Sequence, residues 1–206
     1  MFETGKKRIR IQYTKKPLEK EIKEFIMKKI GILVGSLRKE SWNRKVAKAL
    51  IDLFPEGYGA EIIEIKDLPF YTEDFDSEGS PAVVTDFRAQ VGAKDAFLFV
   101  TPEYNRNITA PLKNALDTAS RPYGQNQWNG KPAAVISATV GSTGAMAANL
   151  SLRNSFVFLN MPLLQQPEVF LSAIAESFDE QGHLVERTKK FLQEFVDAYI
   201  AFINRF

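Results

Sequence analysis

Five short apolar segments alternate with amphipathic segments along most of this 206-residue chain, and no other feature constrains the fold as much. Apolar runs without polar alternation are typical of strands that are buried on both faces of a parallel sheet. We expect strands at 30–34, 60–65, 95–100, 132–138 and 163–171. The last strand is interrupted by Pro167, which predicts a place at the sheet edge. With helices expected at 43–54, 81–91, 110–117, 143–159 and 184–203, the pattern predicts an α/β fold with helices on both faces of the sheet.

The composition excludes several kinds of chemistry. The chain has no cysteine, so disulfides, thiolate catalysis and cysteine-ligated zinc or iron–sulfur sites are excluded. The single histidine, His183, argues against a histidine metal site or a Ser-His-Asp triad, and we expect it in a surface turn. No metal site is therefore predicted. No apolar run has the length of a membrane span and no signal-peptide core is present, so we expect a cytoplasmic protein without membrane contact.

Residues 1–26 differ in charge from the rest of the chain. They hold eight Lys/Arg and four Glu, whereas the whole chain has a net charge of only +2. We expect a basic N-terminal extension at 1–26 and one folded domain at 27–206. The extension could pack on its own domain or a partner subunit, contact a polyanion, or precede a natural start at Met27. We favour packing or simple extension, and binding to nucleic acid is not expected.

Polar loops follow three of the predicted strands. The first, from Gly35 to Asn43, leads into a helix whose leading amides and positive dipole end suit a phosphate. Arg38 can meet two phosphate oxygens at once. The loop lacks the G-x-G-x-x-G and P-loop signatures, which argues against a dinucleotide fingerprint or an NTPase. Simple N-capping by Ser41 is the alternative, but it leaves the arginine unexplained, so we favour phosphate binding.

The other two loops suit a flat ligand. Thr101-Pro102-Glu103-Tyr104-Asn105 follows the third strand, and Thr139 to Ala145, which contains two glycines, follows the fourth. Ordinary βα loops are the alternative for each. Because the carboxyl ends of parallel strands lie at one edge of a sheet, the three loops together predict a site with a phosphate end and a flat-ring end.

These motifs resemble the NADPH-dependent FMN reductase family, which includes quinone, chromate and azo-dye reductases of flavodoxin-like fold. The resemblance covers roughly residues 28–204 and rests on the segments 35–43, 101–105, 111–115, 120–122 and 130–132. It implies a flavodoxin-like three-layer sandwich with strand order 2-1-3-4-5 and an FMN-binding domain at 27–206. The stretch Ala145-Met146-Ala147 departs from the family pattern, which often has glycines and an arginine there.

The resemblance also implies roles for ten residues. Those expected at the FMN phosphate are Ser36, Arg38, Ser41 and Asn43. Those expected along the ribityl chain and the ring are Pro102, Glu103, Tyr104 and Asn105, with Thr139 and Gly141 at the far edge of the flavin. We expect the backbone of Glu103 to seat the ring and its side chain to meet solvent or a neighbouring subunit. No catalytic side chain is predicted, because the flavin N5 carries the chemistry.

The implied function is that of an FMN-dependent oxidoreductase working by ping-pong hydride transfer. NADPH or NADH would reduce the flavin, which would then reduce a quinone, an azo compound, free flavin or a similar small acceptor. Members of the family are commonly homodimers or homotetramers, and we expect the same here. A flavodoxin-type electron carrier is one alternative, although the chain lacks the phosphate loop and acidic face of such carriers. A flavin-binding regulatory protein is another.

The sequence allows more than one role for each of two features outside the three loops. Arg121 could contact a cofactor phosphate or a partner chain, or it could form a structural salt bridge. The segment 70–74 could border the acceptor site or be a solvated surface loop.

Overall fold

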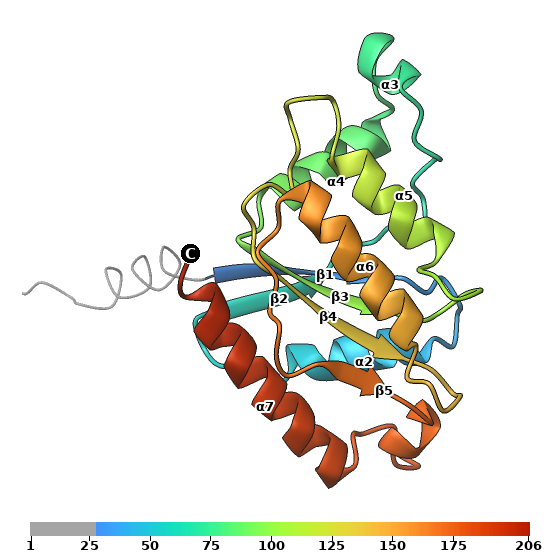
Figure 1. The fold of residues 1–206 in the computed structure, drawn as a ribbon, viewed down its shortest axis with the longest axis vertical. Coiled ribbons are helices and arrows are strands. Elements are labelled where there is room, and N and C mark those ends of the chain that lie inside the picture. Colours follow the sequence, from blue (N-terminus) through green and yellow to red (C-terminus); the bar gives the residue numbers. More distant parts are fainter. Residues whose placement is uncertain (1–27) are drawn as a thin grey trace, which may run out of the picture.

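The computed structural model describes residues 28–206, and the predicted extension at 1–26 lies outside the described residues. The described chain contains a five-stranded parallel sheet with the order β2-β1-β3-β4-β5 (Figure 1). Its strands are β1 (Lys28–Val34), β2 (Tyr58–Ile62), β3 (Ala96–Thr101), β4 (Ala133–Ala138) and β5 (Val169–Leu171). The predicted parallel sheet, its strand order and its flavodoxin-like architecture are confirmed.

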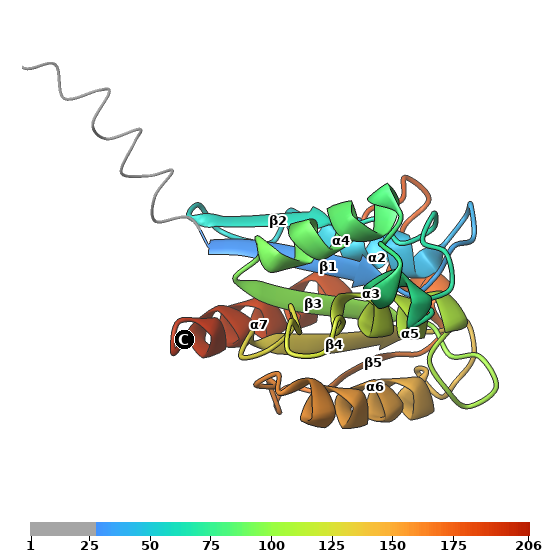
Figure 2. The same cartoon turned by 90° about the horizontal axis from the view of Figure 1, so that it is seen from above.

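Helices cover both faces of the sheet (Figure 2). One face packs against α2 (Trp42–Ile51) and α7 (Glu186–Ile203), and the other against α4 (Ala82–Gly92), α5 (Ala110–Ala119) and α6 (Met146–Leu159). The apolar stripe of α7 lies in the first of these two cores, with Phe195 and Tyr199 buried. The second core is built around Trp128, whose ring packs against Phe97 and Phe99. Burial on both faces accounts for the continuous apolar strands.

Several element boundaries differ from the sequence prediction. Helix α6 begins at Met146 instead of residue 143, because Gly144 and Ala145 have φ angles of +61° and +57°, which do not continue a right-handed helix. Strand β5 begins only after Pro167. The segment between β2 and α4, for which we expected no helix, contains a short one, α3 (Asp74–Ser77), which projects from one end of the molecule in Figure 1. A 3₁₀ helix, η1 (Ile174–Ser177), follows β5.

The register of the strands places the loops after β1, β3 and β4 at the same edge of the sheet. Val34 at the end of β1 pairs with Val100, and Thr101 at the end of β3 pairs with Ser137 in β4. The strands therefore end side by side, and the loops that follow them start from the same edge. Within residues 28–206, no helix is long and apolar enough to cross a bilayer. The same residues contain no cluster of three or more His, Cys, Asp or Glu that could hold a metal ion.

Candidate functional site

A hollow of about 170 Å³ opens where the loops after β1, β3 and β4 meet. The residues that line it are Ser36, Arg38, Ser41, Trp42, Asn43, Pro102, Glu103, Tyr104, Ala138, Thr139, Val140 and Ile174. Eight of the ten predicted site residues are among them, and Asn105 and Gly141 are not. The sequence therefore predicted which residues the fold brings together, whereas their contact with FMN remains a prediction.

The start of α2 presents hydrogen-bond donors to this hollow. Ser41 is the N-cap residue, and its Oγ accepts a hydrogen bond of 3.1 Å from the amide of Arg44. The amides of Trp42 and Asn43 have no acceptor in the described part of the chain, and the first turn of the helix holds no acidic residue. Arg38 is exposed and has no carboxylate partner within residues 28–206. Ser41 thus caps the helix, as the simpler alternative held, and the remaining donors suit an anion.

Asn43 carries a polar atom without a partner. Its Nδ2 donates to the carbonyl oxygen of Ala138 at 3.2 Å, which joins α2 to the end of β4. Its Oδ1 is buried and has no hydrogen-bond partner. Buried polar atoms are nearly always satisfied, so this acceptor calls for a donor that enters the hollow. A hydroxyl group of a ligand would be such a donor.

The loop after β3 forms a tight hairpin at the rim. Tyr104 and Asn107 exchange two backbone hydrogen bonds of 3.0 Å each, and the two residues between them, Asn105 and Arg106, have φ angles of +51° and +65°. Positive φ at both central residues is the requirement of a type I′ turn, and asparagine tolerates it well. Ser151 on α6 donates to Asn107 Oδ1 at 2.6 Å, which anchors the hairpin. The Tyr104 side chain is left half exposed beside the hollow.

The side chain of Glu103 lies elsewhere than predicted. We expected it to meet solvent or a neighbouring subunit, but its Oε2 accepts hydrogen bonds from the amides of Ala147 (2.9 Å) and Ala148 (3.2 Å). The carboxylate therefore caps the amino end of α6, and only 14% of the side chain is exposed. The reason is that the N-cap residue of α6, Ala145, has no side chain able to accept these bonds.

The loop after β4 is held by the segment that follows β5. The amide of Ile174 donates to Thr139 O, and the amide of Ala173 donates to Gly141 O, both at 3.0 Å. These bonds bring the side chain of Ile174 into the wall of the hollow. No signal in the sequence pointed to Ile174, since it lies in a 3₁₀ turn without a recognisable motif.

Arg121 forms a structural salt bridge, which is one of the alternatives that the sequence left open. Its Nη2 lies 2.5 Å from Glu73 Oε1, and its Nε donates to the Tyr71 hydroxyl at 3.1 Å. That hydroxyl donates in turn to Asp76 Oδ2 at 2.6 Å. Partial burial and the Asp76 carboxylate raise the pKa of Tyr71 above its ordinary value. Asn114 holds the same segment by accepting from the Tyr71 amide, so several hydrogen bonds fix the segment 70–74 in place.

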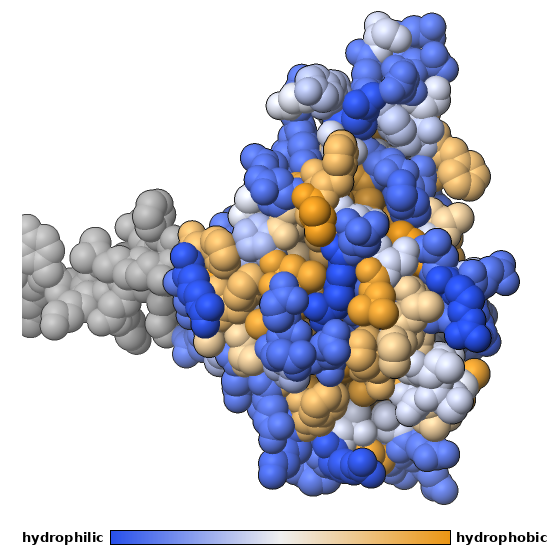
Figure 3. Space-filling model, in the orientation of Figure 1, coloured by the Kyte–Doolittle hydropathy of each residue, from blue (hydrophilic) through white to orange (hydrophobic). Residues whose placement is uncertain are grey.

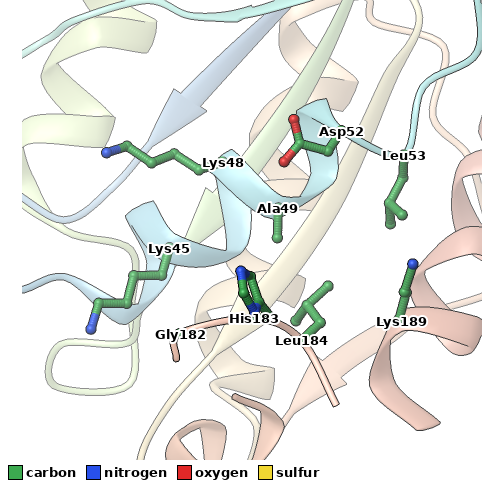
Figure 4. A pocket seen from close by; sticks show the side chains of 9 residues that line it. All are labelled: Lys45, Lys48, Ala49, Asp52, Leu53, Gly182, His183, Leu184 and Lys189. Atoms are coloured by element: carbon green, nitrogen blue, oxygen red, sulfur yellow. The ribbon is translucent and has the colours of Figure 1, made fainter. Parts of the chain in front are cut away.

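A second hollow, of about 410 Å³, lies between α2 and the start of α7 (Figure 4). His183 lies in it, in a surface turn as predicted, and 79% of its side chain is exposed. Figure 4 shows the ammonium groups of Lys45, Lys48 and Lys189 pointing in different directions away from this histidine. The hollow contains no residue of the three loops, so it is not the site that the motifs predict.

Comparison with known proteins identifies the family. The family model described as NADPH-dependent FMN reductase matches residues 28–176, which is most of the chain. The chain belongs to the NADPH-dependent FMN reductase family. The FMN reductase match begins at β1 and ends in η1, so it includes all three loops of the hollow.

Relatives of this FMN reductase family member carry more specific names. A quinone reductase of Pseudomonas putida is 49% identical over 175 residues, which cover 85% of this chain and 94% of that protein. A 2-hydroxy-1,4-benzoquinone reductase of Burkholderia is 43% identical over 177 residues, which cover 85% of this chain and 96% of that protein. Among solved structures, FerB of Paracoccus denitrificans, a flavoenzyme NAD(P)H:(acceptor) oxidoreductase, has a TM-score of 0.81 at 39% identity. The match covers 87% of this chain and 98% of FerB.

The residues of the hollow fit the cofactor that the family name implies. A phosphate needs several converging donors, which the free amides of Trp42 and Asn43 and the guanidinium of Arg38 can supply. A ribityl chain carries hydroxyl donors, and the unpartnered Asn43 Oδ1 can accept from one of them. Close approach of a flat ring is possible at Gly141, where a Cβ would meet only Thr139 Oγ1, at 3.8 Å.

Proposed function

We propose that this protein is an FMN-dependent NAD(P)H:quinone reductase. The observation that carries the proposal is the set of unpaired donors at the start of α2, which faces the loops after β3 and β4 across one hollow. The names of the relatives from Pseudomonas and Burkholderia support a quinone as the acceptor. Bound FMN would supply the hydride chemistry, so the protein has to bind, orient and exclude water.

Different residues of the hollow would bind different parts of the FMN molecule. Ser36, Arg38, Ser41 and the leading amides of α2 would hold the phosphate, and Asn43 Oδ1 would accept from a ribityl hydroxyl. The hollow, at about 170 Å³, is smaller than the sites that enclose whole ligands, which measure roughly 300–1,000 Å³. We therefore expect it to take the phosphate end, leaving the ring near the open rim by Pro102, Glu103 and Tyr104.

A flavin ring that is exposed at the rim suits the ping-pong mechanism that we expect. The nicotinamide and the quinone would use the same exposed face of the ring in turn, so neither needs a pocket of its own. Asn105 and Gly141 do not line the hollow. We propose that they adjoin the ring beyond its rim, as the resemblance implies.

We further propose that the protein is a homo-oligomer that covers the outer face of α6. Four apolar side chains of this helix are exposed, namely Met146, Leu150, Val157 and Phe158, the last by 91%. In Figure 3 apolar groups gather over this part of the surface, interrupted by polar ones. Light scattering should give a dimer or tetramer mass, and Phe158→Glu should lower it. A wild-type monomer would contradict this part of the proposal.

The reductase activity is tested on the purified protein without oxygen. We expect a yellow protein with an FMN spectrum, which NADPH or NADH bleaches and benzoquinone restores, with parallel double-reciprocal plots in the steady state. A bound flavin that dithionite reduces but NAD(P)H does not would favour the flavodoxin-type carrier or a regulatory protein instead. A colourless protein that takes up no FMN on titration would overturn the proposal altogether.

A further inference from the structure

Helix α2 begins at the hollow, whereas α6 begins behind Glu103, one of the residues that line it. The amides at the two helix starts have different partners. At α2 the amides of Trp42 and Asn43 have no acceptor in the part of the chain that the structure describes. At α6 the amides of Met146 and Asn149 donate to backbone oxygens, and those of Ala147 and Ala148 donate to Glu103. Each helix amino end attracts an anion through its free amides and its dipole. Only α2 therefore remains able to receive one.

The cap on α6 comes from a residue of the site and not from the helix itself. Glu103 lies 44 positions before Ala147 in the sequence, in the loop that follows β3. Its other carboxylate oxygen lies 3.9 Å from Arg106 Nη1, but the Arg106 side chain is 80% exposed, so water screens this pair. The hydrogen bonds to α6 are thus the main partners of the Glu103 carboxylate.

The same contact fixes the position of the hairpin at the rim. Glu103 lies directly before Tyr104, where the hairpin begins, and Asn107 at its other end accepts from Ser151 on α6. The hairpin is therefore tied to α6 at both of its ends. Glu103 itself lines the hollow, so its charge belongs to the wall of the site.

We propose that Glu103 is a positioning residue that orients the flavin and lowers its reduction potential. It closes the amino end of α6, so the phosphate is accepted only at α2, and it holds the hairpin that carries Tyr104 beside the ring. Reduction adds negative charge to a flavin, and a fixed carboxylate in the wall of the site opposes that change. A lower potential makes the bound reduced cofactor a stronger reductant toward the acceptor. This inference rests on the proposed FMN binding.

The test separates the charge of Glu103 from its hydrogen bonds. Glu103→Gln removes the charge but keeps an oxygen that can accept from both amides, whereas Glu103→Ala removes both. We expect Glu103→Gln to retain FMN with a more positive midpoint potential in a spectroelectrochemical titration. Glu103→Ala should weaken FMN binding by about tenfold or more, as expected for a lost charge-assisted cap. It should also lose hydrogen-exchange protection at Ala147 and Ala148, which Glu103→Gln should keep.

Glu194→Gln is the matched control, because Glu194 is exposed on α7 and the exchange removes the same charge away from the hollow. Its potential and its FMN affinity should equal those of the wild type. If Glu103→Gln leaves the potential unchanged or makes it more negative, or if Glu103→Ala binds FMN like the wild type, the inference is overturned while the proposed function stands. A wild-type protein that binds no FMN overturns the proposed function, and this inference with it.

Discussion

The hydroxyl group of Tyr199 donates a hydrogen bond of 2.7 Å to the carbonyl oxygen of Phe97, and both residues are fully buried. Tyr199 lies on α7 and Phe97 in β3, so this bond joins the last helix to the central strand of the sheet. The Tyr199 ring also stacks on Phe195. Burial raises the pKa of the Tyr199 hydroxyl well above its ordinary value, since a phenolate would be cut off from water there.

Replacing Tyr199 with Phe should destabilise the protein. The ring is kept, but one buried hydrogen bond is lost, which we expect to lower the free energy of unfolding by about 1–2 kcal/mol. Urea unfolding at neutral pH, followed by tryptophan fluorescence, measures this difference. Tyr58→Phe is a suitable control, because its hydroxyl bonds Asn204 at the surface and its loss should matter less. Equal effects of the two exchanges would contradict the role assigned to Tyr199.

Tyr199 should also make the protein sensitive to alkali. The folded pKa is raised, so in the unfolded chain the hydroxyl ionises near its ordinary value of 10.0 while the folded protein keeps the proton. The stabilisation is therefore complete below pH 10 and is lost as the pH rises above it. Unfolding free energies measured from pH 8 upward should fall less steeply for Tyr199→Phe than for the wild type above about pH 10. Parallel curves would contradict this.

The strands and the three loops of the hollow could be predicted because the evidence for them is local, whereas the strand order was implied by the family resemblance. Apolar runs such as 96–100 indicate buried strands, and serines with an arginine before a helix indicate an anion site. The cap that Glu103 places on α6 could not be predicted, because it joins residues 44 positions apart and depends on how two loops pack. Ile174 was missed for the same reason, since only tertiary packing brings it to the hollow.

Element ends were less predictable than the elements themselves. The pattern extended the helix at 143–159 too far toward its start, because the sequence does not reveal that Ala145 adopts a left-handed conformation. The preceding residue, Gly144, packs so closely on Phe170 that a Cβ at Gly144 would lie 2.7 Å from the Phe170 Cβ, a tertiary contact that the sequence does not reveal either. The short helix α3 was missed because its residues, Asp74–Ser77, are mostly polar and show no apolar face.

Arg38→Ala should weaken FMN binding without changing the fold. Arg38 is exposed and forms no ion pair within the described residues, so its removal costs little stability. A hydrogen bond between charged groups contributes about 1.5–3 kcal/mol, which corresponds to an increase in Kd of roughly ten- to a hundredfold. Fluorescence titration of the apoprotein with FMN measures it. Lys39→Ala removes the neighbouring charge, which does not line the hollow, and should change the Kd only slightly.

Two glycines of the loop after β4 should respond differently to alanine. Gly144→Ala places a Cβ against Phe170 at a φ of +61°, so we expect a loss of about 1–3 kcal/mol in unfolding free energy. At Gly141 a Cβ would meet only Thr139 Oγ1, at 3.8 Å, so Gly141→Ala should leave the stability of the apoprotein nearly unchanged. If the ring approaches Gly141, the same exchange should weaken FMN binding. Unchanged FMN affinity would place the ring elsewhere.

Arg88 should control the segment that carries α3. It donates to Thr118 O (2.8 Å), Ser80 Oγ (2.7 Å) and Asp76 Oδ1 (3.1 Å), and only 13% of its side chain is exposed. Arg88→Met keeps the apolar stem but removes these bonds, so limited proteolysis should cut between residues 72 and 80 several times faster. Arg187→Met, an exchange at an exposed arginine of α7, should leave the cleavage rate unchanged.

The same variant tests whether this segment borders the acceptor site. None of the residues that Arg88 contacts lines the hollow, so the Kd for FMN should stay at the wild-type value. If the loosened segment takes part in binding the quinone, the KM for benzoquinone should rise while the rate of flavin reduction by NADPH is unchanged. An unchanged KM together with faster proteolysis would show that residues 70–74 form a surface loop without contact to the acceptor.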